Sequence, residues 1–236
     1  MYGVTFDVWG TLLDLRRAYA AIADRLAAIL GVKPAEALER LRGAAREARR
    51  LRRREGWSDA RRGAEIVAER LGVDAEELMR VTEEALLDAA DRLPLPGARE
   101  ALALTKRLGV RVGVAGNVLF WPSSLTRRLL EETGLAQLVD EMIFSDEVGA
   151  SKPNPRFFEE AAGRLGVAVE ELVHVGDRPD EDVAGVLAAG GYAVLAWARV
   201  EEDMLCIHPR LCAVKRVSYT PFIVARIARL APPGAP

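Results

Sequence analysis

The sequence has 236 residues, of which 50% are hydrophobic and 29% charged, and its formal net charge is −2. This composition is typical of a packed domain, and the near-neutral charge argues against a general nucleic-acid binder. No run approaches the roughly 20 apolar residues that a membrane span needs, and the N-terminus lacks the features of a signal peptide. We therefore expect a cytoplasmic protein that binds neither nucleic acid nor membranes.

The N-terminal third predicts one strand followed by a long helical region. Residues 3–8 are apolar and β-prone, and a Gly-Thr turn follows them, so we expect a buried strand there. From residue 15 to about residue 93 the pattern is purely helical. Pro34 opens the second helix, and Ser58 and Asp74 are candidate N-terminal caps of the third and fourth.

After residue 94 the pattern changes to alternating helices and strands. The expected helices are 98–108, 122–133, 154–165, 181–189 and 221–230, and the expected strands are 110–115, 141–144, 172–175, 192–197 and 213–217. Such alternation predicts an α/β fold, a Rossmann-like parallel sheet with helices on both faces. We expect residues 1–14 and 95–236 to form this core domain, and residues 15–94 to form an all-helical cap inserted after the first strand.

Carboxylates follow two of the expected strands. Asp7 ends the first strand, and Asp177 follows the apolar run His174–Gly176, with Asp182 five residues further on. Parallel strands present their carboxyl ends at one edge of the sheet, so Asp7 and Asp177 should converge there. Carboxylates that converge repel each other unless a cation or a proton lies between them, and Mg²⁺ suits such a site.

Two other strand ends carry candidate anion-binding groups. Lys152 lies in a Ser-Lys-Pro loop of a chain whose basic residues are mostly arginine, and it could neutralise both Asp7 and an incoming anion. Gly116 and Asn117 end another strand, and their backbone N–H groups and amide could bind an oxyanion.

The four motifs together resemble those of the haloacid dehalogenase superfamily, over nearly the whole chain. The motifs are Phe6-Asp7-Val8-Trp9-Gly10-Thr11-Leu12, Val114-Ala115-Gly116-Asn117, Ser151-Lys152-Pro153, and Val175-Gly176-Asp177 through Asp182. The resemblance implies that Asp7 is the nucleophile of a covalent aspartyl intermediate, that the Trp9 carbonyl, Asp7, Asp177 and Asp182 serve the magnesium site, and that Thr11 and Lys152 position the reacting groups. It also implies a small, phosphorylated substrate.

Two positions depart from the phosphatases of this superfamily. Trp9 stands where they usually carry a second Asp that acts as general acid and base, a contribution worth about 10²–10⁴-fold in rate. Gly116 replaces their usual Ser or Thr. An aromatic residue at position 9 is similar to the tyrosine of the 2-haloacid dehalogenases, whereas Gly176-Asp177 resembles the magnesium-binding form. We favour a magnesium-dependent phosphatase, with a dehalogenase or a catalytically weak, ligand-binding member as alternatives.

Several features have a simple and a functional interpretation. Arg42, Arg46, Arg49 and Arg53 share one side of a helix and could attract an anionic substrate, although we prefer a solvated helix face. We expect His174 to be a core residue. Arg178 could bind substrate or pair with Asp182.

The remaining expectations concern assembly, redox state and source. We favour reduced thiols for Cys206 and Cys212, and a disulfide becomes more plausible if the source is a hyperthermophile. The scarcity of Asn and Gln among many charged residues fits a thermophile. A monomer and a homodimer are both open.

Overall fold

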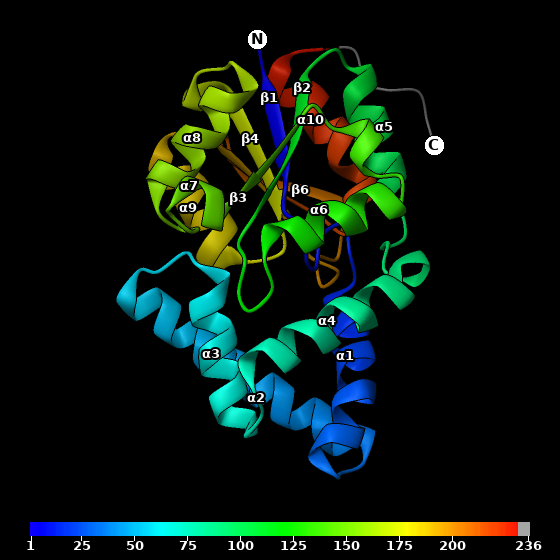
Figure 1. The fold of residues 1–236 in the computed structure, drawn as a ribbon. Coiled ribbons are helices and arrows are strands. Elements are labelled where there is room, and N and C mark those ends of the chain that lie inside the picture. Colours follow the sequence, from blue (N-terminus) through cyan, green and yellow to red (C-terminus); the bar gives the residue numbers. More distant parts are fainter. Residues whose placement is uncertain (231–236) are drawn as a thin grey trace.

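The computed structural model describes residues 1–230 and contains one seven-stranded sheet. The strand order is β3-β2-β1-β4-β5-β7-β6, and β6 alone runs antiparallel to its neighbour (Figure 1). The strands are β1 (Gly3–Phe6), β2 (Arg111–Gly116), β3 (Glu141–Phe144), β4 (Leu172–Gly176), β5 (Tyr192–Ala196), β6 (Met204–His208) and β7 (Leu211–Val214). The predicted α/β fold with a parallel sheet is therefore confirmed.

Helices cover both faces of the sheet, with α5, α6 and α10 on one side and α7, α8 and α9 on the other (Figure 1). The α-helices are α1 (Leu15–Leu30), α2 (Pro34–Glu55), α3 (Ala60–Leu71), α4 (Ala75–Asp88), α5 (Ala98–Arg107), α6 (Ser123–Glu132), α7 (Ser145–Val148), α8 (Pro155–Leu165), α9 (Ala184–Ala189) and α10 (Thr220–Ala228). Short 3₁₀ turns and one π-helical turn, η4 (Pro179–Val183), complete the secondary structure.

The central strand β1 lies between two parallel neighbours and is buried on both faces. Its residues pair in parallel with β2 on one side and β4 on the other, so that Phe6 lies opposite both Val114 and Val175. All four residues of β1 are buried. Because β1 lies between β2 and β4, the residues that follow these three strands meet at one place on the sheet edge.

Helices α1 to α4 form a separate body, the helical unit, at the carboxyl ends of the strands (Figure 1). Helix α2 packs an alanine-rich stripe inward, with Leu41, Ala44, Ala45 and Ala48 buried at helical spacing. The chain enters the helical unit just after Asp14 and leaves it near Leu93. These two connections are hydrogen-bonded to each other, since Asp14 N donates to Leu93 O (2.7 Å). Within residues 1–230, no helix has the length and apolar character that crossing a bilayer requires.

The structure corrects four sequence-based details. The antiparallel strand β6 was not among the expected strands, and β7 begins at Leu211, earlier than the expected strand over 213–217. Asp59, not Ser58, caps the third helix by accepting a hydrogen bond from Arg61 N (2.8 Å). The expected helix over 181–189 is a π-helical turn, η4, followed by α9.

The expectation of two reduced thiols was wrong. Cys206 and Cys212 lie directly opposite each other on the antiparallel strands β6 and β7, and they form a disulfide. Cross-strand neighbours place their Cβ atoms close together, so the register of this hairpin brings the sulfur atoms within bonding reach. The unexpected strand and the unexpected disulfide therefore have one cause.

Candidate functional site

Asp7 lies immediately beyond β1, and its backbone continues the sheet for one more residue. Its N–H donates to Val175 O (2.7 Å), which fixes the start of the following loop. The residue is only 7% exposed. A carboxylate in this position is held rigidly by the sheet and still faces a pocket of about 80 Å³ that it shares with Trp9, Asn117 and Asp177.

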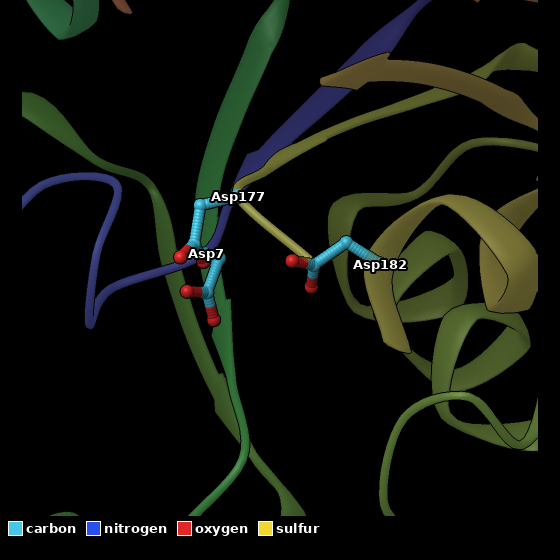
Figure 2. Close-up of side chains that lie close together, drawn as sticks. All are labelled: Asp7, Asp177 and Asp182. Atoms are coloured by element: carbon cyan, nitrogen blue, oxygen red, sulfur yellow. The ribbon is translucent and has the colours of Figure 1, made fainter. Parts of the chain in front are cut away.

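Three carboxylates converge at this edge of the sheet, as the sequence predicted for Asp7 and Asp177. Oxygen atoms of Asp7, Asp177 and Asp182 all lie within 4.8 Å of one another. Figure 2 shows that Asp7 and Asp177 lie side by side, while Asp182 points toward them from a separate segment. Such proximity of buried like charges is unfavourable unless cations offset it.

Lys152 supplies one of those cations. Its Nζ donates to Asp7 Oδ1 (2.6 Å), to Asp182 Oδ1 (2.6 Å) and to the Ala115 carbonyl (2.9 Å), so all three ammonium donors are used. The side chain is 2% exposed. Burial alone would lower the pKa of Lys152, but the charges of Asp182 and Asp7 raise it above its ordinary value. Lys152 therefore remains a buried cation.

One lysine does not balance three carboxylates. Burial raises the pKa of Asp7 to about 8; Lys152 opposes the rise, and Asp182 and Asp177 add to it. Burial, with the charge of Asp182 next, raises the pKa of Asp177 to about 6. The protein alone thus favours a protonated Asp7, and a further cation would favour the ionised, nucleophilic form.

Asp182 is the carboxylate that this protein holds ionised. Burial would raise its pKa, but Lys152 and a hydrogen bond from His174 bring it below its ordinary value. His174 Nε2 lies 3.0 Å from Asp182 Oδ1, and its Nδ1 lies 2.9 Å from the Thr5 hydroxyl. Burial and the nearby Lys152 lower the pKa of His174, so the ring is neutral and donates through Nε2. His174 is a satisfied core residue, as expected.

Two glycines make this close approach of the acidic groups possible. A Cβ atom on Gly10, whose φ is +101°, would lie 2.5 Å from Asp177 Oδ2. A Cβ atom on Gly176 would lie 2.2 Å from the Asp182 carboxylate. Any larger residue at either position would displace a carboxylate of the cluster.

Asn117 faces the loop that carries Lys152. Its Oδ1 accepts from Lys152 N (2.8 Å), and its Nδ2 donates to Lys152 O (3.0 Å) and to Glu181 Oε2 (3.1 Å). The side-chain amide therefore fixes the lysine loop in place, although Asn117 also lines the pocket. Gly116 is buried, and a Cβ atom there would lie 3.2 Å from the Phe144 ring.

Aromatic side chains form one wall of the pocket. Trp9 lies edge-on to Trp121 with 5.2 Å between ring centroids, and Trp121 in turn contacts Phe120 and Tyr19. Thr11 is buried, and its hydroxyl has no hydrogen-bond partner within residues 1–230. Both Trp9 and Trp121 line the pocket.

Sequence reasoning missed a buried ion pair at this site. Arg52 of α2 donates from one Nη to both carboxylate oxygens of Glu181, at 3.0 Å each, and from the other to Val118 O (2.7 Å). Arg178, which we expected to bind substrate or pair with Asp182, pairs through its side chain with Asp180; its backbone N–H donates to Asp182 Oδ2 (2.9 Å). Arg52 is surrounded in sequence by other arginines, and it differs from them only in being buried. The sequence therefore gives no signal that identifies it.

The cluster suits a hard divalent cation. All its donors are carboxylate oxygens, the ligand type that Mg²⁺ prefers, and Mg²⁺ commonly uses one or two carboxylates together with waters. Asp177 Oδ1 is buried and has no hydrogen-bond partner within the described chain. An unsatisfied buried carboxylate oxygen is costly, and a bound cation would satisfy it.

Comparison with known proteins agrees with this geometry. Residues 1–190 match the model of a family described as haloacid dehalogenase-like hydrolase. The chain is 33% identical to glyceraldehyde 3-phosphate phosphatase of Methanopyrus kandleri over 64% of this chain and 65% of the relative. It is 39% identical to phosphoserine phosphatase of Thermus thermophilus over 51% of this chain and 47% of the relative. The aligned segments thus span about half to two thirds of these curated relatives.

A solved structure supports the fold over nearly the full length. The crystal structure of a HAD phosphatase from Thermococcus onnurineus superposes with a TM-score of 0.69 at 24% identity, covering 95% of this chain and 98% of that one. The family match, the sheet order and the convergence of the four motifs on one edge lead to the same conclusion. The chain belongs to the haloacid dehalogenase-like hydrolases.

Proposed function

We propose that this protein is a magnesium-dependent phosphatase that acts on a small phosphorylated metabolite through an aspartyl-phosphate on Asp7. The observation that carries the proposal is the cluster of Asp7, Asp177 and Asp182 within 4.8 Å of one another, with Lys152 between two of its members. Phosphoryl transfer depends chiefly on positioning and charge neutralisation, and this arrangement provides both. The relatives named above are phosphatases, which supports the same reaction class.

Each residue has a distinct role in the proposed reaction. Asp7 attacks phosphorus, the bond to the leaving oxygen breaks, and that oxygen departs with the electron pair. Water then attacks the phosphorus of the aspartyl-phosphate, releasing phosphate and regenerating Asp7. Lys152 neutralises Asp7 and the phosphoryl oxygens, while Thr11 and the backbone at Gly116 offer donors to those oxygens.

Magnesium would be held by Asp7, Asp177 and the Trp9 carbonyl, with Asp182 in support. When bound, the ion supplies positive charge that keeps Asp7 ionised and offsets the charge on the phosphoryl group. Asn117 contributes indirectly, because its amide holds the loop of Lys152 in place. Arg178 lines the pocket and faces the substrate side.

The first turnover step lacks a protein acid, because Trp9 occupies the position of the usual acid–base Asp. The leaving oxygen must then take its proton from water. Acyl and aryl phosphates, which have good leaving groups, should therefore be the best substrates, and alkyl phosphates should be slower.

Residues 15–94 are proposed to act as a cap that covers the site from the carboxyl edge of the sheet, with residues 1–14 and 95–236 as the catalytic core. A contact between α2 and the turn η4 supports this assignment, since Arg52 reaches Glu181. We also propose a cytoplasmic location; the disulfide then fits a hyperthermophilic source, consistent with the low Asn and Gln content.

The proposal is tested by p-nitrophenyl phosphate hydrolysis with and without magnesium, comparing wild type with Asp7→Asn. We expect slow, magnesium-dependent turnover in wild type and none in Asp7→Asn. Turnover that persists in Asp7→Asn would show that Asp7 is not the nucleophile. Asp180→Asn is the matched control, because this carboxylate is close in sequence to Asp177 and Asp182 but is half exposed and paired with arginines.

A dehalogenase is the alternative function. Trp9, which packs against Trp121, resembles the aromatic residue that 2-haloacid dehalogenases have at this position. That reaction would displace halide from carbon and need no metal. Chloride release from 2-chloropropionate in the presence of EDTA would favour it. Absence of halide release, together with magnesium-dependent phosphate release, would end it.

A further inference from the structure

Arginines of the helical unit differ in whether they have an acidic partner. Within residues 15–94, nearly every arginine lies within 4.0 Å of a carboxylate; the exceptions are Arg16, Arg46 and Arg49. Glutamates are abundant on the same helices, so a shortage of partners does not explain the exceptions.

The three exceptions lie together. Arg16 of α1 and Arg46 and Arg49 of α2 line one groove of about 350 Å³, which Arg42 also lines. No acidic residue lines this groove within the described chain. Like charges gathered without a counter-ion repel one another, so an anion that occupies the groove would stabilise this arrangement.

The groove continues into the catalytic pocket. Leu15, Tyr19 and Arg49 line both spaces, so they form the boundary between the groove and the pocket that contains Asp7. Arg49 is near enough to Tyr19 to oppose the rise in pKa that burial imposes on the tyrosine hydroxyl. A molecule bound at Asp7 can therefore extend past Tyr19 toward Arg49 and Arg46.

From this geometry we infer that the substrate carries a second anionic group, a carboxylate or a second phosphate, which Arg49 binds with help from Arg46 and Arg16. The inference rests on the proposed phosphatase activity and specifies its substrate class. Arg42 takes a lesser part, because it already donates to Glu39 Oε1 (3.0 Å). The preference for a merely solvated helix face is therefore replaced by a specificity role for the side of α2 that faces α1.

The size of the two spaces limits the substrate further. The pocket at Asp7 has about 80 Å³ and the groove about 350 Å³, so only the phosphoryl group and its nearest atoms fit at Asp7. The rest of the molecule must lie along the groove. The second anion then belongs at the end of the substrate remote from the reacting phosphate.

The test compares matched substrates that differ only in this anion. Alkyl phosphates of two to five carbons are assayed beside ω-carboxyalkyl phosphates of the same lengths, with magnesium, for wild type, Arg49→Met and Arg50→Gln. Arg50 is the matched control, because it neighbours Arg49 on α2, lies outside the groove and pairs with Glu47.

We expect wild type to show a kcat/KM about 10- to 100-fold higher for the carboxylated member of the best-fitting pair, the effect of a charge-assisted hydrogen bond. Arg49→Met should abolish this preference by lowering kcat/KM for the carboxylated substrates toward that of the alkyl phosphates, and Arg50→Gln should keep the preference. Equal rates for both series in wild type would overturn the inference. An equal loss on both series in Arg49→Met would also overturn it, because Arg49 would then serve only the fold.

A binding measurement separates this inference from the proposed activity. Isothermal titration of wild type and Arg49→Met with 3-phosphonopropionate and with propylphosphonate requires no turnover. If no phosphate ester is hydrolysed, the phosphatase proposal fails, yet tighter binding of 3-phosphonopropionate that is lost in Arg49→Met still supports the second-anion site. Equal affinities of wild type for the two phosphonates would overturn the inference of a second-anion site.

Discussion

Arg52 and Glu181 form an ion pair whose side chains are only 2% and 4% exposed, and it joins α2 of the helical unit to the turn η4. Glu181 also accepts a hydrogen bond from Asn117, which holds the loop of Lys152. The position of the helical unit is therefore connected, through three side chains, to the position of Lys152.

Removing one partner of this pair should be strongly destabilising. Arg52→Met leaves the Glu181 carboxylate buried without its main counter-charge, so we expect a loss of about 3 kcal/mol in the free energy of unfolding. Urea denaturation followed by circular dichroism measures this. The double variant Arg52→Met/Glu181→Met should be less destabilised than the sum of the single variants. Additive losses would mean that the two side chains do not depend on each other.

Position 9 should control the rate of the chemical step. Trp9→Asp supplies the missing acid–base group, so we expect p-nitrophenyl phosphate hydrolysis to rise, by up to about 10²-fold. Asn has the same size as Asp, and Trp9→Asn loses the same contact with Trp121. The amide cannot transfer a proton, however, so hydrolysis by Trp9→Asn should stay slow. Equal rates for the Asp and Asn variants would show that the missing acid does not limit turnover.

The disulfide should contribute to stability without affecting activity. Cys206 and Cys212 are six residues apart, and closing so short a loop constrains the unfolded chain by about 2 kcal/mol. We expect Cys206→Ala/Cys212→Ala to unfold at lower denaturant concentration with unchanged kcat, because β6 and β7 lie at the opposite end of the sheet order from β2 and β3. Thiol titration of the denatured wild type should find no free cysteine; two free thiols would disprove the bond.

Asp140 should make stability depend on pH. Burial would raise the pKa of Asp140, but the Val112 N–H and Lys106 bring it below its ordinary value. A lowered folded pKa stabilises the protein above the ordinary pKa of Asp, about 4, and this contribution disappears as pH falls through the folded pKa. Asp140→Asn should therefore cost up to about 1 kcal/mol at pH 7 and little at pH 3, measured by urea denaturation. A constant difference across this range would contradict the assignment.

The sequence predicted those parts of the site that depend on strand order. Asp7 and Asp177 could be placed together because each directly follows an apolar run, and parallel strands end at one edge. In the structure, Asp7 and Asp177 lie close together and Asp182 joins them. The helices of residues 15–93 were equally predictable, because their apolar residues recur at helical spacing.

The parts that escaped prediction depend on contacts between distant segments. Strand β6 contains the short apolar run Met204–Ile207, but it is largely exposed at the edge of the sheet, so its pairing with β7 defines it as a strand, and the disulfide follows from that pairing. Arg52 resembles its arginine neighbours in sequence, and only the docking of α2 against η4 buries it. A local pattern carries no information about either contact.

The position of β1 has a consequence for the order in which the chain assembles. Gly3–Phe6 is the first strand synthesised, yet its two neighbours begin only at Arg111 and Leu172. Helices α1 to α4 have mainly local contacts and can form while β1 is still unpaired, since pairing between segments far apart in sequence is slow. Asp7, which directly follows β1, is thus fixed in place only after most of the chain has emerged, so an incompletely folded chain cannot contain the cluster of three carboxylates.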